Sequence, residues 1–458
     1  QLSKNKFLAA LAAFFLAVNP WHMFFSRTGY EVNMATSLLV LGTLCFILAV
    51  NKKNNLLLFF PSVLSFVLAL YTYNVTRLVA PLLFFSLVAM YFKKITIHSK
   101  LRIALLCGLF IAAMMPIVVT QFTLQKQAGF ASLGDALLTG KVAKAEILQT
   151  RSYFVGLPGI VQKILFNYWV LLFWKFLSNL ITFFSTSFFF LVGADHPHEN
   201  IGGFGMFYYA DFPLIVYGAY EGIRKKASFL YPFYLWFIFM LLVGGLIVAI
   251  PKDNAFGTRV YPVVIPLIVF SAFGMYQLLE NIVHMKNKTV KIAAGTGLIL
   301  MLGYSYLFYF TSYFVRFPVE YAREWKSEDA HMVNFVLSIE PKYKKVIFDD
   351  STGFTYTSLL FYGKYPPVLH QQQAIYRLNG LVNTLVSDGK YEFRKVDFAK
   401  EMATPETLFI TADNHVPENV QPLAVFSYPT RPVVLFYNRR IGQYPTTETA
   451  YEIFASGK

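Results

Sequence analysis

Long apolar runs recur between residues 7 and 311, and shorter polar segments separate them. Most of the runs approach the ~20 residues that an α-helix needs to cross a ~30 Å hydrocarbon core. They cover residues 38–50, 56–70, 78–92, 103–120, 229–250, 260–279 and 292–309, with shorter runs at 7–18 and 212–223. The pattern predicts a polytopic α-helical membrane protein with about nine transmembrane helices.

The polar segments are of two kinds, and they alternate along the chain. Every second one is short and basic, as expected of cytoplasmic turns. These basic turns are residues 51–54, 93–102, 224–226 and 286–291. The remaining segments, at 19–33, 71–77, 121–211 and 251–259, are therefore expected on the outer face of the membrane. The net charge of +15 then reflects topology, and because it is scattered over turns no nucleic-acid partner is expected.

The large outer loop 121–211 is too long for a turn and too apolar for a disordered segment. Residues 130–148 have the pattern of an interfacial amphipathic helix. Residues 164–192 are long enough to cross, but crossing would invert every later basic turn. They are interpreted as a re-entrant or interfacial hairpin broken near Lys175–Asn179, and a single crossing is the alternative.

From residue 321 the long apolar runs stop and charged residues become frequent, which predicts a soluble extracytoplasmic α/β domain over 321–458 after a transmembrane domain over 1–320. Local patterns predict helices and strands in this domain. The helices are expected at 327–339 and 352–361, the strands at 345–349 and 407–411, and a β-hairpin from 423–428 and 433–437.

Three arginines occur at the same expected depth, at the outer membrane boundary: Arg27, Arg77 and Arg259. A guanidinium can bind a phosphate in a bidentate manner, so together they could hold one polyprenyl phosphate or diphosphate. Two alternatives stay open. Arg27 could pair with Glu31 four residues later on one helix, and Arg77, near Tyr73, could reach toward lipid head groups.

Residues 193–205 form the densest polar cluster between the apolar runs. Asp195, His196, His198 and Glu199 are of metal-ligand types, but so close together in one loop they seldom complete a coordination shell, so no metal site is expected. The glycines of this loop could equally serve to pack it against another element. Signatures of zinc proteases, phosphate-binding loops and serine hydrolases are absent from the sequence.

Three stretches in order resemble bacterial GT-C membrane glycosyltransferases, the relatives of protein O-mannosyltransferase and lipid A aminoarabinose transferase. The first is Asn-Pro-Trp-His at 19–22 with Ser-Arg-Thr-Gly-Tyr-Glu at 26–31. The second is Phe-Phe-Leu-Val-Gly-Ala-Asp at 189–195 with His198 and Gly205, and the third contains Pro251, Asn254 and Arg259. The likeness covers most of the chain.

The resemblance implies inverting transfer of a hexose or pentose from a polyprenyl-phosphate donor to a glycan, lipid or protein acceptor on the outer face. It implies that Arg27, Arg77 and Arg259 contact the donor phosphate. Donor sugar or acceptor would meet the substrate-binding residues Glu31, Tyr73, Asp195, His198 and Asn254. The acidic catalytic residue of the family lies in a first outer loop, expected upstream of Gln1. Cofactors are open, since some relatives use a divalent cation.

Two other classes of function remain. The chain could be a transporter or flippase of lipid-linked glycans, although such proteins usually carry ionisable residues within their spans, near the midplane. It could also be a non-catalytic scaffold for envelope assembly. An acidic residue in the upstream outer loop would favour the enzyme over the scaffold.

Overall fold

The computed structural model describes residues 5–52, 55–95, 97–123, 147–183, 185–194, 196–246, 256–349, 355–379, 382–411, 420–429, 433–437, 440–444 and 447–455. The chain divides into two compact units, Gln1–Phe310 and Thr311–Lys458. The composition alone indicates a boundary at residue 320, a short way into the second unit.

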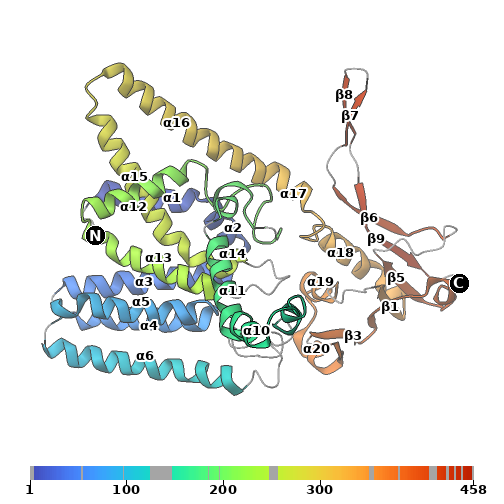
Figure 1. The fold of residues 1–458 in the computed structure, drawn as a ribbon. Coiled ribbons are helices and arrows are strands. Elements are labelled where there is room, and N and C mark those ends of the chain that lie inside the picture. The colour runs from blue at the N-terminus through green and yellow to red at the C-terminus, as the bar shows by residue number, and fades with distance from the viewer. Residues whose placement is uncertain are drawn as a thin grey trace. The chain divides into compact units, whose positions relative to one another are not determined.

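The first unit is helical. Its main helices are labelled in Figure 1. They are α1 (Lys6–Val18), α2 (Pro20–Thr28), α3 (Glu31–Asn51), α4 (Leu56–Thr72), α5 (Thr76–Tyr91), α6 (Ile97–Thr123), α10 (Gly159–Leu165), α11 (Tyr168–Phe183), α12 (Asp211–Arg224), α13 (Tyr231–Leu246), α14 (Phe256–Val260), α15 (Val264–Val283) and α16 (Lys288–Thr311).

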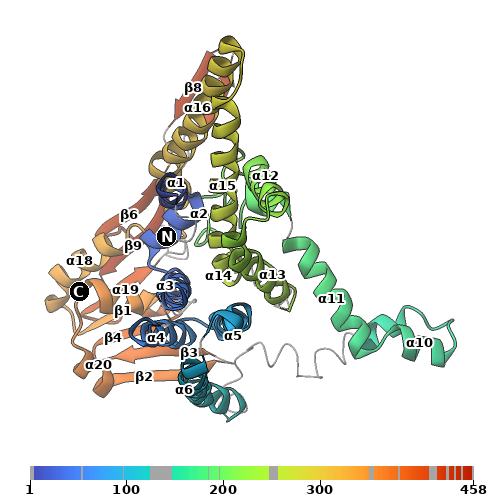
Figure 2. The ribbon, with the colours of Figure 1, turned by 90° about the vertical axis from the view of Figure 1, so that its left-hand side faces the viewer.

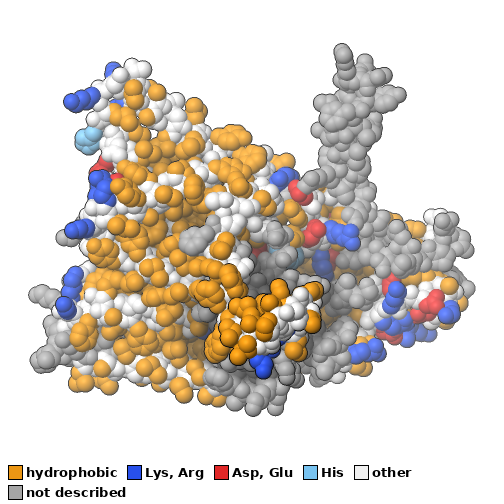
Figure 3. All heavy atoms as spheres, in the orientation of Figure 1, with side chains coloured by type: hydrophobic (Ala, Val, Ile, Leu, Met, Phe, Trp, Pro, Cys, Tyr) orange, Lys and Arg blue, Asp and Glu red, His pale blue; other side chains and the backbone are white. Residues whose placement is uncertain are grey.

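The expected apolar helices are present. By length and composition, 5 helices of the described chain could cross a membrane, or up to 7 if each of two bent pairs forms one span. The bent pairs are α1 with α2, at 60°, and α10 with α11, at 43°. Apolar side chains cover the face of this unit that Figure 3 shows, as a surface in contact with lipid requires. The number of crossings, about nine, stays a prediction.

One expectation for the outer loop is wrong. A break was expected near Lys175–Asn179, but α11 is continuous through these residues, and the chain bends before it, between Leu165 and Tyr168. No glycine or proline occurs within α11, and the three polar side chains Lys175, Ser178 and Asn179 do not by themselves interrupt a helix. The amphipathic helix expected at 130–148 lies almost wholly outside the described residues.

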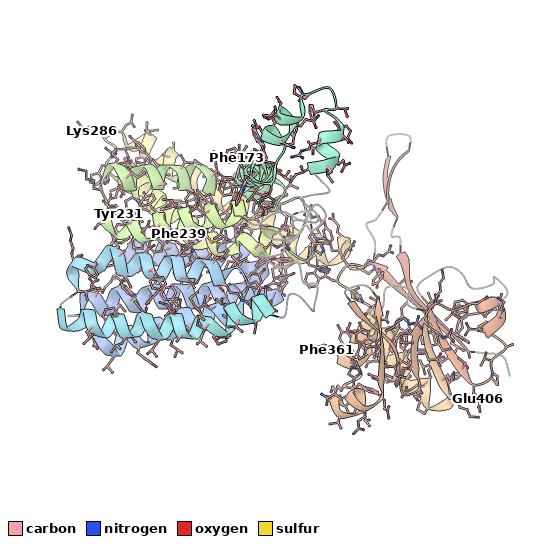
Figure 4. All side chains as sticks on the ribbon, turned by 60° about the horizontal axis from the view of Figure 1, so that its bottom comes forward. Phe173, Tyr231, Phe239, Lys286, Phe361 and Glu406 are labelled. Atoms are coloured by element: carbon pink, nitrogen blue, oxygen red, sulfur yellow. The ribbon has the colours of Figure 1, made fainter. Side chains whose placement is uncertain are left out.

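The basic turns gather at one end of the helical unit. The connections α3–α4, α5–α6, α12–α13 and α15–α16 all lie there (Figure 1), and Lys and Arg side chains line this edge in Figure 3. Lys286, labelled in Figure 4, belongs to it. We call it the basic end. The α1–α2, α2–α3 and α4–α5 connections and α14 lie at the opposite end, the site end, as the alternation of polar segments predicts.

Helices α12 and α15 pack so closely that their backbones are in contact. A Cβ atom on Gly218 would lie 1.9 Å from the carbonyl oxygen of Phe270, and one on Gly274 would lie 2.1 Å from that of Leu214. Only residues without a side chain allow this approach, which is common between membrane helices. Figure 2 shows α12 beside α15.

The second unit is built on a seven-stranded mixed sheet of order β2-β3-β4-β1-β5-β9-β6, and a separate two-stranded ladder joins β7 and β8. In the seven-stranded sheet, β1 is parallel to β4 and β5, and the other pairs are antiparallel. The strands are β1 (Lys345–Asp349), β2 (Ala374–Asn379), β3 (Val382–Asp388), β4 (Tyr391–Arg394), β5 (Thr407–Thr411), β6 (Ala424–Pro429), β7 (Val433–Tyr437), β8 (Arg440–Tyr444) and β9 (Thr447–Ala455).

The central strands of this sheet are buried on both faces. On β1, Val346 and Phe348 pack in one apolar cluster, which includes residues of α18 (Asp329–Ile339) and α19 (Thr355–Tyr362). Ile347 faces the other way and packs with Phe398 in the short helix α21 (Phe398–Glu401). The alternation follows from the two-residue period of a strand.

The predictions of individual strands and helices in this unit are confirmed, but the predicted strand pairing is not. The strands at 345–349 and 407–411 and the helices at 327–339 and 352–361 correspond to β1, β5, α18 and α19. The hairpin of 423–428 with 433–437 is wrong. Both segments are strands, but β6 pairs with β9 and β7 with β8. A local pattern identifies a strand but not a partner that lies far along the chain.

Candidate functional site

The site end of the helical unit is organised around the start of α2. Asn19 is buried and caps this helix: its Oδ1 accepts a hydrogen bond from the backbone N–H of His22 at 3.0 Å. Its Nδ2 donates to the carbonyl oxygen of Met206 at 3.3 Å, and the Tyr208 hydroxyl donates to the Val18 carbonyl at 2.6 Å. The loop between residues 192 and 210 is therefore held against the first sequence motif, although the two are far apart in the chain.

The glycine-rich loop has the packing role that its sequence left open. Gly193 has a φ of 83°, and a Cβ there would lie 2.0 Å from Nδ2 of Asn200. That amide in turn donates to the carbonyl oxygens of Val192, at 2.8 Å, and Phe204, at 2.7 Å. The loop is thus closed by a buried asparagine that only a glycine at 193 can accommodate.

Glu199 joins this loop to the segment that precedes α15. Its side chain is buried, with 3% exposed, and both carboxylate oxygens are used. Oε2 accepts the backbone N–H of Gly257 at 2.9 Å, and Oε1 accepts that of Thr258 at 3.0 Å. A Cβ on Gly257 would lie 2.7 Å from Oε2, so a side chain at this position would have to displace the carboxylate. We call the two hydrogen bonds of Glu199 to Gly257 and Thr258 the clamp. Arg259 is the next residue, so the clamp fixes the backbone that carries this cation.

Burial and hydrogen bonding have opposite effects on the pKa of Glu199. Burial raises the pKa of the Glu199 carboxyl, while hydrogen bonds from Thr258 and Gly257 and the nearby His196 act to lower it. The net direction is upward, because removing a carboxylate from water disfavours its charged form.

Two tyrosines border the clamp. The Tyr30 hydroxyl donates to the carbonyl oxygen of His198 at 2.6 Å, and burial with the negative charges of Glu199 and Glu31 raises the pKa of Tyr30 to about 12. The pKa of Tyr73 is also raised, and burial is the largest cause. Its side chain forms a hydrogen bond with Thr258 and is close enough to Glu199, Arg259 and Glu31 to feel their charges. Four of the predicted residues, Glu31, Tyr73, His198 and Arg259, thus belong to one neighbourhood.

A hydrogen-bonded group lies beside it, between α2, α3 and the turn before α15. The Tyr261 hydroxyl donates to Oδ1 of Asn33 at 2.7 Å and is 2.8 Å from Nδ1 of His22. Since a hydroxyl carries one proton, a Tyr261 hydroxyl that donates to Asn33 can only accept from Nδ1 of His22. Trp21 and Phe25 pack against the Tyr261 ring at centroid distances of 5.3 and 4.8 Å.

The other predicted residues have different surroundings. Arg27 is exposed in the last turn of α2, and Glu31 begins α3, so the two do not share one helix as the pairing alternative required. Gly29, with a φ of 72°, separates the helices. Arg77 is half-buried at the start of α5, where its Nε donates to the Leu70 carbonyl at 3.4 Å. Asp195 and Asn254 lie outside the described residues.

Sequence reasoning missed the part of Glu199, His22, Asn33 and Tyr261 in this site. Glu199 stood out only as one of several polar residues in its loop, and its two backbone partners lie 58 and 59 residues later. Within the described ranges, no three His, Cys, Asp or Glu side chains are grouped so as to hold a metal ion. No protein-family model, curated protein or solved structure matches the chain.

Proposed function

We propose that the chain transfers a sugar from a polyprenyl-phosphate-linked donor to an envelope acceptor on the outer face of a bacterial plasma membrane. The observation that carries this proposal is the clamp of Glu199 on the backbone of Gly257 and Thr258. It holds Arg259 in the neighbourhood of Tyr73 and Glu31, at the end of the helical unit opposite the basic turns. A cation, a carboxylate and phenols at a membrane boundary fit a lipid-linked phosphate and its sugar.

In the proposed reaction, an acceptor hydroxyl oxygen attacks the anomeric carbon of the donor sugar. The bond from that carbon to the phosphate oxygen breaks, and the phosphate leaves with the electron pair. A carboxylate base takes the proton of the acceptor, and Arg27, Arg77 and Arg259 stabilise the departing phosphate. Because attack and departure occur on opposite sides, the configuration at the anomeric carbon inverts.

The remaining residues of the proposed site would orient the reactants. Glu31, Tyr73 and His198 are close to Arg259 or to its clamp and can hydrogen-bond to sugar hydroxyls. Asp195 and Asn254 are proposed to act with them, on the resemblance alone. A donor sugar held in this way loses little entropy on reaching the transition state.

The proposal includes a topology of about nine crossings, with the basic end in the cytoplasm and the sheet unit outside. The gathering of basic turns at one end of the helical unit supports this orientation. A transporter of lipid-linked glycans is less favoured, because the charged residues of the candidate site are at the site end and not midway along the helices.

The test is transfer of a radiolabelled hexose or pentose from polyprenyl-phosphate donors to envelope acceptors, with the full-length reading frame in proteoliposomes. Arg259→Ala and Arg27→Ala are each expected to reduce transfer roughly 100-fold. Lys93→Ala, which removes an exposed cation at the basic end, is the matched control and should leave transfer unchanged. Transfer that survives both arginine changes would remove them from the mechanism. A folded wild-type protein inactive across the donor panel would favour a transporter or scaffold.

A further inference from the structure

The sheet unit has a polar group of its own, at the edge of the sheet. Asp388, the last residue of β3, is 1% exposed. Its carboxylate accepts a hydrogen bond from Nδ1 of His370 at 2.6 Å and one from the Tyr365 hydroxyl at 3.2 Å. Nε2 of His370 is 2.7 Å from the hydroxyl of Tyr376. A chain of two hydrogen bonds therefore leads from a buried carboxylate to one tyrosine.

That tyrosine is presented to solvent. Tyr376 lies on β2, the edge strand of the sheet, and its side chain is 44% exposed. The pairing of β2 with β3 shifts register between Ile375 and Tyr376. The extra residue of this irregularity is Val386, on β3, and such bulges occur often at sheet edges and next to functional sites. The His370 hydrogen bond fixes the orientation of the exposed Tyr376 ring.

Other exposed aromatic and apolar side chains come from the same stretch of chain, α19, α20 (Pro367–Gln373) and β2. Phe361 is 76% exposed and is labelled in Figure 4, where it projects from the sheet unit. Tyr362 and Leu369 are each 40% exposed. Gln373 adds an amide, whose Oε1 lies 3.5 Å from the Tyr365 hydroxyl.

An exposed aromatic ring next to fixed planar polar groups is suited to a sugar. The C–H face of a pyranose packs on an aromatic ring, and its hydroxyls need donors and acceptors at fixed positions. A lipid surface would use the apolar side chains but has no need of a buried Asp–His pair behind one of them. A side chain held by packing and by a second layer of hydrogen bonds is preorganised, so that less entropy is lost on binding.

We propose that Tyr376, His370 and Gln373 form a carbohydrate-binding platform for a neutral oligosaccharide. That this platform holds a glycan acceptor rests on the proposed transferase function. That it binds an oligosaccharide does not depend on that function. The platform would bring an acceptor chain to the protein, while the chemistry takes place at the site end of the helical unit.

The test is oligosaccharide binding by the full-length protein in nanodiscs, without donor lipid, measured by isothermal titration calorimetry. The probes are the pentasaccharides of β-1,4-glucose, β-1,4-N-acetylglucosamine, α-1,4-glucose and α-1,6-mannose. Tyr376→Ala should weaken binding of the preferred probe at least about tenfold, since both the stacking surface and the hydroxyl are lost. Tyr376→Phe keeps the ring but releases it from His370, and a loss of roughly threefold is expected. Tyr153→Ala, at a tyrosine 75% exposed in the helical unit, is the matched control and should bind as wild type.

The outcomes separate this proposal from the transferase proposal. Wild-type affinity in Tyr376→Ala, or no binding of any probe by folded wild-type protein, would overturn the platform whatever the transfer assay shows. The Phe variant removes one oxygen atom, so it guards against a misfolded alanine variant: equal binding by Phe and wild type would remove the His370 relay from the proposal. Binding that is intact in a protein without transferase activity would leave the platform standing and overturn the enzyme.

Discussion

Oε2 of Glu199 accepts a hydrogen bond from the backbone N–H of Gly257 at 2.9 Å, so a carboxylate of one polar segment is bound to the main chain of another. Its second oxygen is bound to Thr258 in the same way. The two donors are backbone N–H groups, so they cannot move to a new partner unless the main chain moves.

Glu199→Gln should lower the free energy of unfolding by about 1–3 kcal/mol, because the amide NH2 of glutamine would face a backbone N–H and leave a buried donor unpaired. Thermal unfolding in detergent measures the change. Glu31→Gln is the control: this side chain is exposed in the first turn of α3, where a charge contributes at most about 1 kcal/mol. Equal effects of the two changes would mean that the clamp does not stabilise the fold.

The same pair of proteins gives a pH test. The pKa of Glu199 is raised by burial above its ordinary value of 4.5, so the folded state binds more protons than the unfolded state between the two values. The stability of wild type relative to Glu199→Gln should therefore fall as pH rises through this window. Unfolding temperatures at a series of pH values from about 4 to 8 check the sign. A gap that widens with pH would indicate that the hydrogen bonds outweigh burial.

Gly193 and Gly29 form a matched pair for the loop. Both have positive φ, at 83° and 72°, so alanine costs each about 1–2 kcal/mol of backbone strain. At Gly193 a Cβ would also lie 2.0 Å from Asn200 Nδ2, whereas at Gly29 nothing lies within 4 Å. Gly193→Ala should thus be clearly more destabilising in thermal unfolding, and similar values would mean that the loop rearranges at little cost.

The His22–Tyr261–Asn33 group predicts energetic coupling. Tyr261→Phe and His22→Ala should be non-additive in unfolding, with an interaction energy of roughly 0.5–3 kcal/mol, because each change removes the same hydrogen bond. Tyr234 bonds to the Ala219 carbonyl and has no part in this group, so Tyr261→Phe with Tyr234→Phe serves as the additive control. Additivity of the first pair would contradict the geometry.

Strand pairing in the sheet unit can be tested with cysteines, after Cys45 and Cys107 are changed to serine. Ser427 and Thr449 are opposite each other in the β6–β9 ladder, and cysteines there should form a disulfide detectable by mass spectrometry. The local hairpin expected from the sequence would instead set Ser427 opposite Val434. Cross-linking of Ser427→Cys with Val434→Cys, and not with Thr449→Cys, would restore the hairpin.

Patterns of a few residues predicted much of this molecule. The apolar runs and basic turns predicted long helices and two chemically distinct ends, because lipid constrains every residue of a span. Strands β1 and β5 were predictable because they are buried on both faces and therefore continuously apolar. The partner of β6 was not, since pairing depends on a strand that follows much later.

The candidate site divides in the same way. Arg259, Tyr73 and Glu31 could be selected because charged and phenolic residues are unusual beside apolar runs. Glu199 and Tyr261 could not, since their roles come from backbone groups and side chains brought close only by folding. For Arg27 and Glu31 the local spacing predicts a relationship that the fold does not have. Their spacing of four indicates one helix, but a glycine in the left-handed conformation starts a new helix between them.

The backbone contact of α12 with α15 has a consequence at some distance from the site. Asp211 Oδ1 accepts from the Ser271 hydroxyl at 2.8 Å at the start of α12, and Asn281 Nδ2 donates to the Tyr217 hydroxyl at 2.8 Å nearer the basic end. Gly274 lies between Ser271 and Asn281 on α15, and at its contact with Gly218 there is no space for a side chain. The loop of Glu199 leads into α12 and the turn of Arg259 leads into α15, so the spacing of these helices is part of what brings Glu199 to Gly257. We therefore expect a methyl group added at Gly274 to separate the helices and weaken the contact of Glu199 with Gly257, although no residue of the site would have changed.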